Sequence, residues 1–473
     1  MAANQPSSMR RDIVSAYIAA GAKIASWAIV SAIVYRKLGA TAFGLLALVR
    51  ATIGLLNYAA VGLGPALVRL IAEETSKPRP MPLAVEPDGG VISYRTPQVA
   101  PDPASAAYVT GLLVAAVAGA IGLALTWSYA RWFAVLHHIG VANEDIAVLV
   151  GMIGIGTVLR FVSDAPGAML QTRGRICTDN GLLAGADVTW ALMTASFVLK
   201  AKAPATVADA GVALAIANAW LLVARLVFAG GAVNLRGGIG INHVMLRRLL
   251  TMGGLVVLAQ LADYLYAPTD YILIDRLLEP IHLAAYAPAV QIDGALLVLV
   301  SGLAAVLLPK SAMAHAAGDM VAVRRYYLRG TLASAGLLIL AGIVVWGACP
   351  WIFRLWLGNP MIGTQMILPL VLVHTIIGGS SAVGRSILLG MGKVKAFTVS
   401  VLIAGVSNVL FSIVFVKYLH LGLSGIVLGT IVAVTLRCGM WMPWYVLRSL
   451  RESTAALLPL EVADGGASPT LHN

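Results

Sequence analysis

The sequence contains few charged residues. Of its 473 residues, only 11% are Asp, Glu, Lys or Arg, whereas 59% are hydrophobic. A soluble globular protein typically has about a quarter of its residues charged. The low charge content therefore excludes an ordinary soluble domain and is typical of a chain whose outer surface contacts lipid.

Cysteine is also scarce, and familiar catalytic and nucleotide motifs are absent. The three cysteines, Cys177, Cys349 and Cys438, lie far apart and form no Cys/His pattern of a metal site or disulfide framework. The chain has no GxxxxGK[ST] loop for nucleotide phosphates. We therefore expect no metal site, no cofactor, no catalytic residues and no nucleic-acid partner.

Long apolar runs dominate the chain. We expect about twelve membrane spans of about 20 residues or slightly more each, the length that a helix needs to cross about 30 Å of hydrocarbon. The runs are continuous rather than alternating, which favours helices over strands. The fold class predicted is an all-α polytopic membrane protein. The expected spans are residues 13–34, 43–68, 105–128, 145–169, 178–199, 209–232, 249–274, 283–308, 330–349, 364–384, 396–416 and 422–447.

The basic residues predict the orientation of the chain. If the N-terminus is cytoplasmic, the segments on the cytoplasmic side contain most of the Lys and Arg that lie outside the spans. An even number of spans then places both termini in the cytoplasm. The net charge of +12 follows this topology, so it does not indicate nucleic acid.

A repeat of basic pairs suggests two halves. Arg10-Arg11 precedes the first expected span and Arg247-Arg248 precedes the seventh. Two halves of six helices with the same orientation are a common plan among transporters. The expected domains are residues 1–240 and residues 241–450.

Two segments are expected outside the membrane. Residues 73–104 are rich in proline and show no helical period, which predicts an extended cytoplasmic loop. Residues 451–473 are polar and rich in small residues, which predicts a disordered cytoplasmic tail.

Two cations inside the first spans are candidates for substrate contacts, because a charge in the bilayer costs about 2.5–3.5 kcal/mol on insertion scales. Lys23 lies about 15 Å into its span, near the midplane, where it binds substrate or pairs with an acid of a neighbouring helix. Arg50 lines a cavity or extends to the outer interface.

Further cations lie in later spans. Arg160 is a third candidate for substrate binding, although Asp164 is four residues away on the same helical face and could neutralise it. Arg225 and Arg437 lie towards the cytoplasmic ends of their spans, where they could extend to the interface.

Three acids in the second half are candidates for coupling-ion binding or gating. Asp263 and Asp270 are seven residues apart, hence on one helical face, and Pro268 between them should kink the helix. Asp293 lies in the next span. These carboxylates could bind a cation or proton, pair with basic residues, or make polar contacts between helices.

Two regions of the sequence resemble a known family. The stretch from Arg36 to Leu48, followed by Val61 to Arg69, resembles the first two helices of bacterial polysaccharide exporters. The stretch from Asp263 to Ala289 is similar to their seventh and eighth helices. The family is the O-antigen and exopolysaccharide lipid flippases, within the multidrug/oligosaccharidyl-lipid/polysaccharide superfamily. The proline-rich loop is longer than expected for this family.

This resemblance implies two six-helix lobes around a central cavity and transport by alternating access in the bacterial inner membrane. The implied cargo is a polyprenyl-diphosphate-linked oligosaccharide, with a polysaccharide polymerase as a further partner. Lys23, Arg50 and Arg160 would bind the diphosphate. Arg and Lys are the natural counter-charges for such an anion, and its outward movement from a negative cytoplasm is downhill by about 2.3 kcal/mol per charge per 100 mV.

Two other functions compete with the flippase. A cation-coupled multidrug antiporter of the same superfamily would need a cavity dominated by acids, which Asp263 and Asp270 favour and the first-half cations oppose. A membrane enzyme would need a substantial extramembrane site with acid and base residues. The short outside loops disfavour that alternative.

Overall fold

The computed structural model describes the chain with gaps. It covers residues 6–53, 67–68, 70–71, 103–136, 141–200, 204–230, 244–251, 267–279, 281–391 and 393–464. Within these ranges the regular secondary structure is entirely helical. The proline-rich loop expected at residues 73–104 lies outside them, apart from its last two residues.

The chain divides into two compact units, which we describe separately. Unit 1 comprises residues 1–38 and 53–261, and unit 2 comprises residues 39–52 and 262–473. The change of unit near residue 39 occurs within helix α1 (Pro6–Ile53), where Gly39 has φ 90° and ψ 175°. An L-residue rarely adopts this φ, so glycine permits the break.

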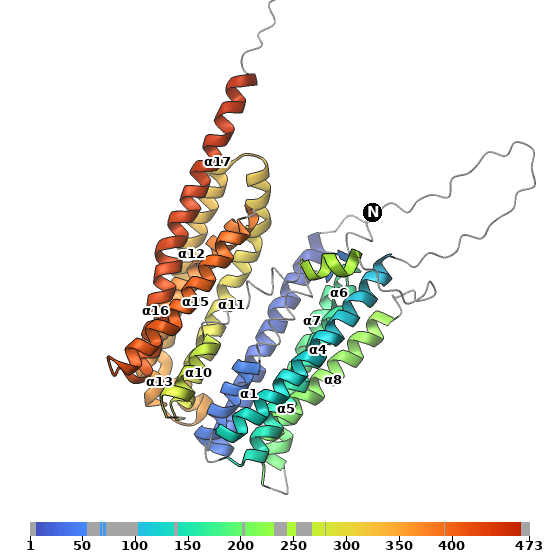
Figure 1. The fold of residues 1–473 in the computed structure, drawn as a ribbon, viewed down its shortest axis with the longest axis vertical. Helices are drawn as coiled ribbons and strands as arrows, with labels where there is room; N and C mark the ends of the chain where they lie inside the picture. Colours follow the sequence, from blue (N-terminus) through green and yellow to red (C-terminus); the bar gives the residue numbers. More distant parts are fainter. Residues whose placement is uncertain are drawn as a thin grey trace, which may run out of the picture. The chain divides into compact units, whose positions relative to one another are not determined.

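Unit 1 is a helical bundle. Its labelled helices after α1 are α4 (Pro103–Leu136), α5 (Asn143–Val162), α6 (Asp164–Thr172), α7 (Ile176–Lys200) and α8 (Ala208–Gly230). Helix α5 packs against both α4 and α8, and α7 packs along α8 (Figure 1). These helices are apolar over most of their surface, as expected of helices that contact both protein and lipid.

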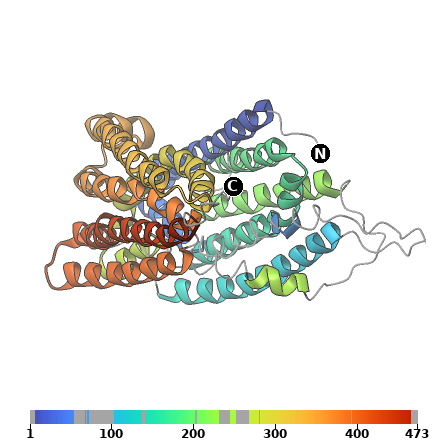
Figure 2. The ribbon, with the colours of Figure 1, turned by 90° about the horizontal axis from the view of Figure 1, so that it is seen from above.

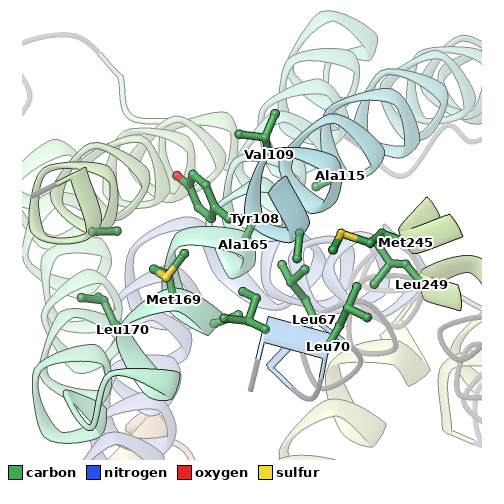
Figure 3. Packing of buried hydrophobic residues seen from close by; sticks show 14 of the residues in the cluster. Leu67, Leu70, Tyr108, Val109, Ala115, Ala165, Met169, Leu170, Met245 and Leu249 are labelled. Atoms are coloured by element: carbon green, nitrogen blue, oxygen red, sulfur yellow. The ribbon is translucent and has the colours of Figure 1, made fainter. Parts of the chain in front are cut away.

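A hydrophobic cluster joins segments of unit 1 that are distant in sequence. Figure 3 shows Leu67 and Leu70 beside Met245 and Leu249, with Tyr108 of α4 nearby. All of them are at most 7% exposed. The cluster brings the short helical segment 244–251 into unit 1.

Unit 2 contains the remaining helices, drawn in yellow to red in Figure 2. They are α10 (Ala267–Leu277), α11 (Ile281–Ala316), α12 (Met320–Leu357), α13 (Ile362–Ser380), α14 (Ala382–Gly390), α15 (Val394–Lys417), α16 (Gly422–Val434), the π-helix η2 (Thr435–Trp441) and α17 (Met442–Asp464). The second part of α1 belongs here because it packs on α11: a Cβ on Gly44 would lie 3.1 Å from the Leu283 Cβ.

The end of α17 corrects the sequence analysis. Residues 451–464 are helical, whereas a disordered tail was expected from residue 451. An ion pair one turn apart supports the helix there, with Arg448 Nε 2.8 Å from Glu452 Oε1. Residues 465–473 lie outside the described part of the chain.

The all-α membrane fold is confirmed. Across the described ranges, ten helices are long and apolar enough to cross a membrane. They correspond to ten of the expected spans. The other two expected spans, residues 43–68 and 249–274, are only partly described.

Small residues bring α15 and α16 close together. A Cβ on Gly425 would lie 3.1 Å from the Phe415 carbonyl carbon, and a Cβ on Gly429 would lie 2.7 Å from the Ser412 backbone nitrogen. Glycines four residues apart commonly allow such close approach between membrane helices. This approach also positions polar side chains that are described below.

We expect Gly429→Ala to lower the thermal unfolding midpoint of the purified protein, by an amount that corresponds to about 1–3 kcal/mol. The added methyl group would meet both the side-chain oxygen and the backbone of Ser412, and the backbone atoms cannot rotate away as a side chain can. Gly336→Ala on α12 is the control, since no atom lies within 4 Å of its Cβ position and alanine favours helix. Equal midpoints for both variants would contradict this prediction.

Candidate functional site

Asp270 on α10 is more deeply buried than Asp293, the other acid of the predicted set that the structure describes. Its side chain is 0% exposed and accepts hydrogen bonds from three other helices. Tyr286 Oη of α11 donates to Oδ2 over 2.9 Å, Asn408 Nδ2 of α15 donates to Oδ1 over 3.0 Å, and Thr430 Oγ1 of α16 donates to Oδ2 over 2.8 Å. We call these four residues the Asp270 cluster.

The Asp270 cluster lies deep within the span helices of unit 2. Thr430 is eight residues after the start of α16 and Asn408 is nine residues before the end of α15, so both lie about 12–14 Å from those ends. A hydrocarbon core of about 30 Å puts this level near its middle. A carboxyl group at that depth costs free energy, and such groups in membrane spans usually have a functional role.

The energies of the Asp270 cluster are closely balanced. A hydrogen bond to a charged group contributes about 1.5–3 kcal/mol, and three of them stabilise the carboxylate by about 5–9 kcal/mol. Removing the same ion from water costs several kcal/mol. The hydrogen-bond stabilisation and the desolvation cost are of similar size. Binding of a proton or a monovalent cation can therefore determine whether Asp270 is neutral or charged.

The Asp270 cluster also contains oxygen atoms that can bind a cation. The Thr430 hydroxyl has one proton, which reaches either Asp270 Oδ2 or Asn408 Oδ1 at 3.0 Å. Ser412 Oγ lies 3.5 Å from the same amide oxygen. Carboxylate, amide and hydroxyl oxygens are the ligands that hard cations prefer.

Asp293 forms a second polar contact in unit 2. It is 8% exposed, and Thr375 Oγ1 of α13 donates to its Oδ1 over 2.6 Å. His374, the neighbour of Thr375, lies within electrostatic range of Asp293. The two acids therefore lie in one unit, each hydrogen-bonded to a side chain of another helix.

Two tyrosines lie near both of these acids. The rings of Tyr271 and Tyr286 meet edge to face, with centroids 5.0 Å apart. Asp270, Asp293 and Arg50 are all within electrostatic range of Tyr271. The structure thus brings Asp270, Asp293 and Arg50 into one region of unit 2, whereas the sequence analysis placed Arg50 in the first lobe.

In unit 1, Arg160 is bound to a carboxylate. Its Nη1 lies 2.7 Å from Asp187 Oδ1 of α7, and its Nη2 donates to Asp187 Oδ2 over 3.4 Å. The sequence analysis also considered an ion pair between Arg160 and Asp164. That partner is wrong, because Arg160 pairs with Asp187. Arg160 as a diphosphate ligand remains a prediction, and Asp187 would compete with the anion.

Arg225 is buried in a second ion network. It is 2% exposed, with Nη2 2.8 Å from Asp179 Oδ1 and Nη1 3.1 Å from Asp164 Oδ1. The expectation that Arg225 extends to the interface is wrong, because these acids and the Ser163 carbonyl hold it inside the bundle. Gly167 leaves room for the guanidinium, since a Cβ there would lie 2.8 Å from its central carbon.

The structure says little about two other residues of the predicted site, Lys23 and Asp263. Lys23 is exposed on the unit 1 part of α1. Asp263 lies outside the described residues, as do the other residues from 252 to 266, so the kink expected at Pro268 stays a prediction.

Sequence reasoning missed the partners of the acids. Asn408, Thr430 and Tyr286 around Asp270, and Asp179 beside Arg225, were not selected. A signal existed for Asn408 and Asp179, since each is a strongly polar residue within an apolar span. Which residues face one another across helices could not be read from the chain.

The chain resembles solved structures of membrane transporters. The chain aligns with an inward-facing multidrug resistance MATE transporter of the MOP superfamily, with a TM-score of 0.71, 16% identity, and coverage of 92% of this chain and 99% of that one. It has the MATE fold. Two further structures with the MATE fold are a MATE protein in complex with MaD3S (TM-score 0.64, 16% identity, coverage 94% and 96%) and a Pyrococcus furiosus MOP transporter (0.60, 12%, 94% and 96%).

A family model also matches part of the sequence. The MatE family model matches residues 256–414, which include Asp270, Asp293 and Asn408. A comparison with curated protein sequences gives no match. The description of the Pyrococcus furiosus protein reports a binding pocket of reversed polarity and suggests a different function for it.

Proposed function

We propose that this protein is a cation-coupled antiporter that exports amphiphilic organic cations across a bacterial inner membrane, with both termini in the cytoplasm. The observation that carries this proposal is Asp270, a buried carboxyl group held by side chains from α11, α15 and α16. A secondary transporter needs such a group, because its occupancy by a proton or sodium ion must change during the cycle. The MATE fold supports this class of transport.

The charges of unit 1 also support a cationic cargo. Asp187 neutralises Arg160, while Asp164 and Asp179 surround Arg225. An anionic cargo would have to displace these carboxylates from the arginines. Breaking a buried pair costs about 3–5 kcal/mol, which disfavours that exchange.

The lipid-linked oligosaccharide flippase is the second candidate. Arg50 favours it, since a half-buried guanidinium near Tyr271 is suited to a phosphate group. The Pyrococcus furiosus protein indicates that pockets of different polarity occur on this fold. Lys23, Arg50 and Arg160 remain the predicted contacts of such a cargo, and a polysaccharide polymerase the predicted partner.

Transport by purified protein in liposomes tests the proposal. With an imposed proton or sodium gradient, we expect efflux of ethidium at a rate well above that of empty liposomes. Collapse of the gradient by an ionophore should return efflux to that background. Efflux that ignores both gradients would contradict the antiporter, and gradient-dependent movement of a polyprenyl-diphosphate sugar without ethidium efflux would establish the flippase instead.

A further inference from the structure

We propose that an exposed face of α17 binds the headgroup of an anionic phospholipid. Trp444, Leu447, Arg448 and Arg451 line a hollow of about 360 Å³ on this face, and we call these four residues the α17 site. Sites for small molecules have volumes from about 300 Å³ upward, so the hollow has room for a phosphoglycerol headgroup. The α17 site shares no residue with the Asp270 cluster and does not depend on the proposed cargo.

Helix α17 has two faces of different chemistry. Met442, Val446 and Leu450 recur every four residues, are at most 4% exposed and pack in a hydrophobic cluster with the start of α12. The α17 site lies on the opposite side of the helix, as the helical period requires. Trp444 is 54% exposed there, and the Arg448 side chain is 58% exposed. The apolar face therefore holds α17 in unit 2 and leaves the α17 site uncovered.

The α17 site lies at the depth of the lipid headgroups. The membrane span that begins at Gly422 continues through η2 into α17. Trp444 is 22 residues and Arg451 is 29 residues after Gly422, which corresponds to about 33 Å and 44 Å along the helix. The hydrocarbon core is about 30 Å thick, and the bilayer with its headgroups about 40–45 Å. Trp444 therefore lies just beyond the hydrocarbon, where Trp is common, and Arg451 lies among the headgroups.

Both arginines of the α17 site can bind a further anion. Arg451 is exposed and makes no ion pair or hydrogen bond within the described part of the chain. Arg448 pairs with Glu452, but both side chains are more than half exposed, and such a pair contributes little stability. Arg448 and Arg451 are three residues apart on one helical face, so a single phosphate group can accept hydrogen bonds from both.

The other two residues favour a lipid over a free phosphate ion. The Trp444 ring centre lies 5.3 Å from the guanidinium carbon of Arg448, and Leu447 lies half-buried in the same hollow. A phosphate ion gains nothing from apolar side chains, whereas the glycerol and the first acyl carbons of a phospholipid are stabilised by them. The termini are expected in the cytoplasm, where the membrane surface is negatively charged. The ligand class is therefore a phospholipid with a net negative charge.

Native mass spectrometry of the full chain, released from a non-ionic detergent, tests the site because it counts the phospholipids that stay bound. Phosphatidylglycerol is titrated in parallel with phosphatidylcholine of the same acyl chains. Each titration is repeated with inorganic phosphate and with chloride at equal ionic strength. The unmodified protein is compared with Arg451→Gln, Arg451→Lys, Trp444→Ala and Glu452→Gln.

Arg354→Gln is the matched control. Arg354 is exposed in the last turn of α12, 31 residues after Val323, which is about 46 Å along the helix. Val323 packs in the same hydrophobic cluster as Leu450 of α17. The control therefore loses one exposed positive charge at the end of α12 that is remote from the α17 site.

We expect the unmodified protein and the control to retain one phosphatidylglycerol at a lower concentration than phosphatidylcholine. The half-saturating concentration of phosphatidylglycerol should rise about fivefold or more in Arg451→Gln. It should rise less in Arg451→Lys, which keeps the charge but lacks the guanidinium fork. Trp444→Ala should also raise it, because an apolar contact is lost. Glu452→Gln should lower it, because a competing carboxylate is removed.

Equal retention of the two phospholipids by the unmodified protein, or equal half-saturating concentrations for Arg451→Gln and Arg354→Gln, would overturn the site. Displacement of phosphatidylglycerol by inorganic phosphate, but not by chloride, would overturn the choice of a lipid as the ligand. Arg451→Gln should fold, since Arg451 is exposed. These measurements involve no transport. Their failure would therefore leave the antiporter proposal standing, and failure of ethidium efflux would leave the α17 site standing.

Discussion

Asp270→Asn is expected to reduce gradient-driven ethidium efflux to the background of empty liposomes. Asparagine has nearly the same shape as aspartate, but it carries no charge and releases no proton. A coupling site that cannot change its charge cannot link cargo movement to a cation gradient. Efflux measured with imposed proton and sodium gradients in turn also identifies which cation the unmodified protein uses.

Asp270→Asn should leave the fold intact. The substitution weakens charge-assisted hydrogen bonds from Tyr286 and Asn408, but it also removes the several kcal/mol that a buried carboxylate costs. Thr430 has another acceptor within reach, since its Oγ1 lies 3.0 Å from Asn408 Oδ1. We expect an unfolding midpoint within a few degrees of that of the unmodified protein.

Asp319→Asn is the matched control for this prediction. Asp319 precedes the first residue of α12, and its Oδ1 accepts a hydrogen bond from the Ala322 amide over 2.8 Å. Asparagine caps helices as well as aspartate does, so both stability and transport should persist. Gradient-driven efflux that survives in Asp270→Asn would exclude Asp270 as the coupling group.

The fold could be predicted from the sequence because its main signal is local. A continuous apolar run identifies a span without knowledge of its neighbours, and ten expected spans recur among the described helices. The assignment of residues 39–52 to unit 2 could not be predicted from such local signals. It depends on the packing of Gly44 against Leu283, which are far apart in the sequence.

Only the charged residues of the candidate site could be predicted from the sequence. A carboxylate such as Asp270 in an apolar span is conspicuous because of its cost, whereas Thr430 and Tyr286 are common residues that become significant only through contact with it. Pairing followed helix packing rather than sequence spacing. Arg160 therefore binds Asp187, 27 residues away, and not Asp164 on the same face.

The ion network of unit 1 provides the prediction with the largest effect on stability. Arg225→Met should lower the free energy of unfolding by about 3–5 kcal/mol, because it leaves a buried carboxylate without its counter-charge. Asp179 is 0% exposed and lies 2.8 Å from Arg225, so it bears most of this cost. The Gln171 amide still donates to Asp179 Oδ2 over 2.8 Å, which offsets a part of it. Denaturation in mixed micelles measures the difference.

Two further variants separate loss of the buried pair from loss of a charge. Arg448→Met removes a charge from an exposed pair with Glu452, where both side chains are more than half exposed, and should cost about 0–1 kcal/mol. In Arg225→Met combined with Asp179→Leu, both buried charges are absent, and most of the lost stability should return. Asp164 is 31% exposed, so solvent can compensate for its own loss of Arg225. If the double variant is no more stable than Arg225→Met alone, packing of the long Arg225 side chain, rather than its charge, holds α8 against α6 and α7.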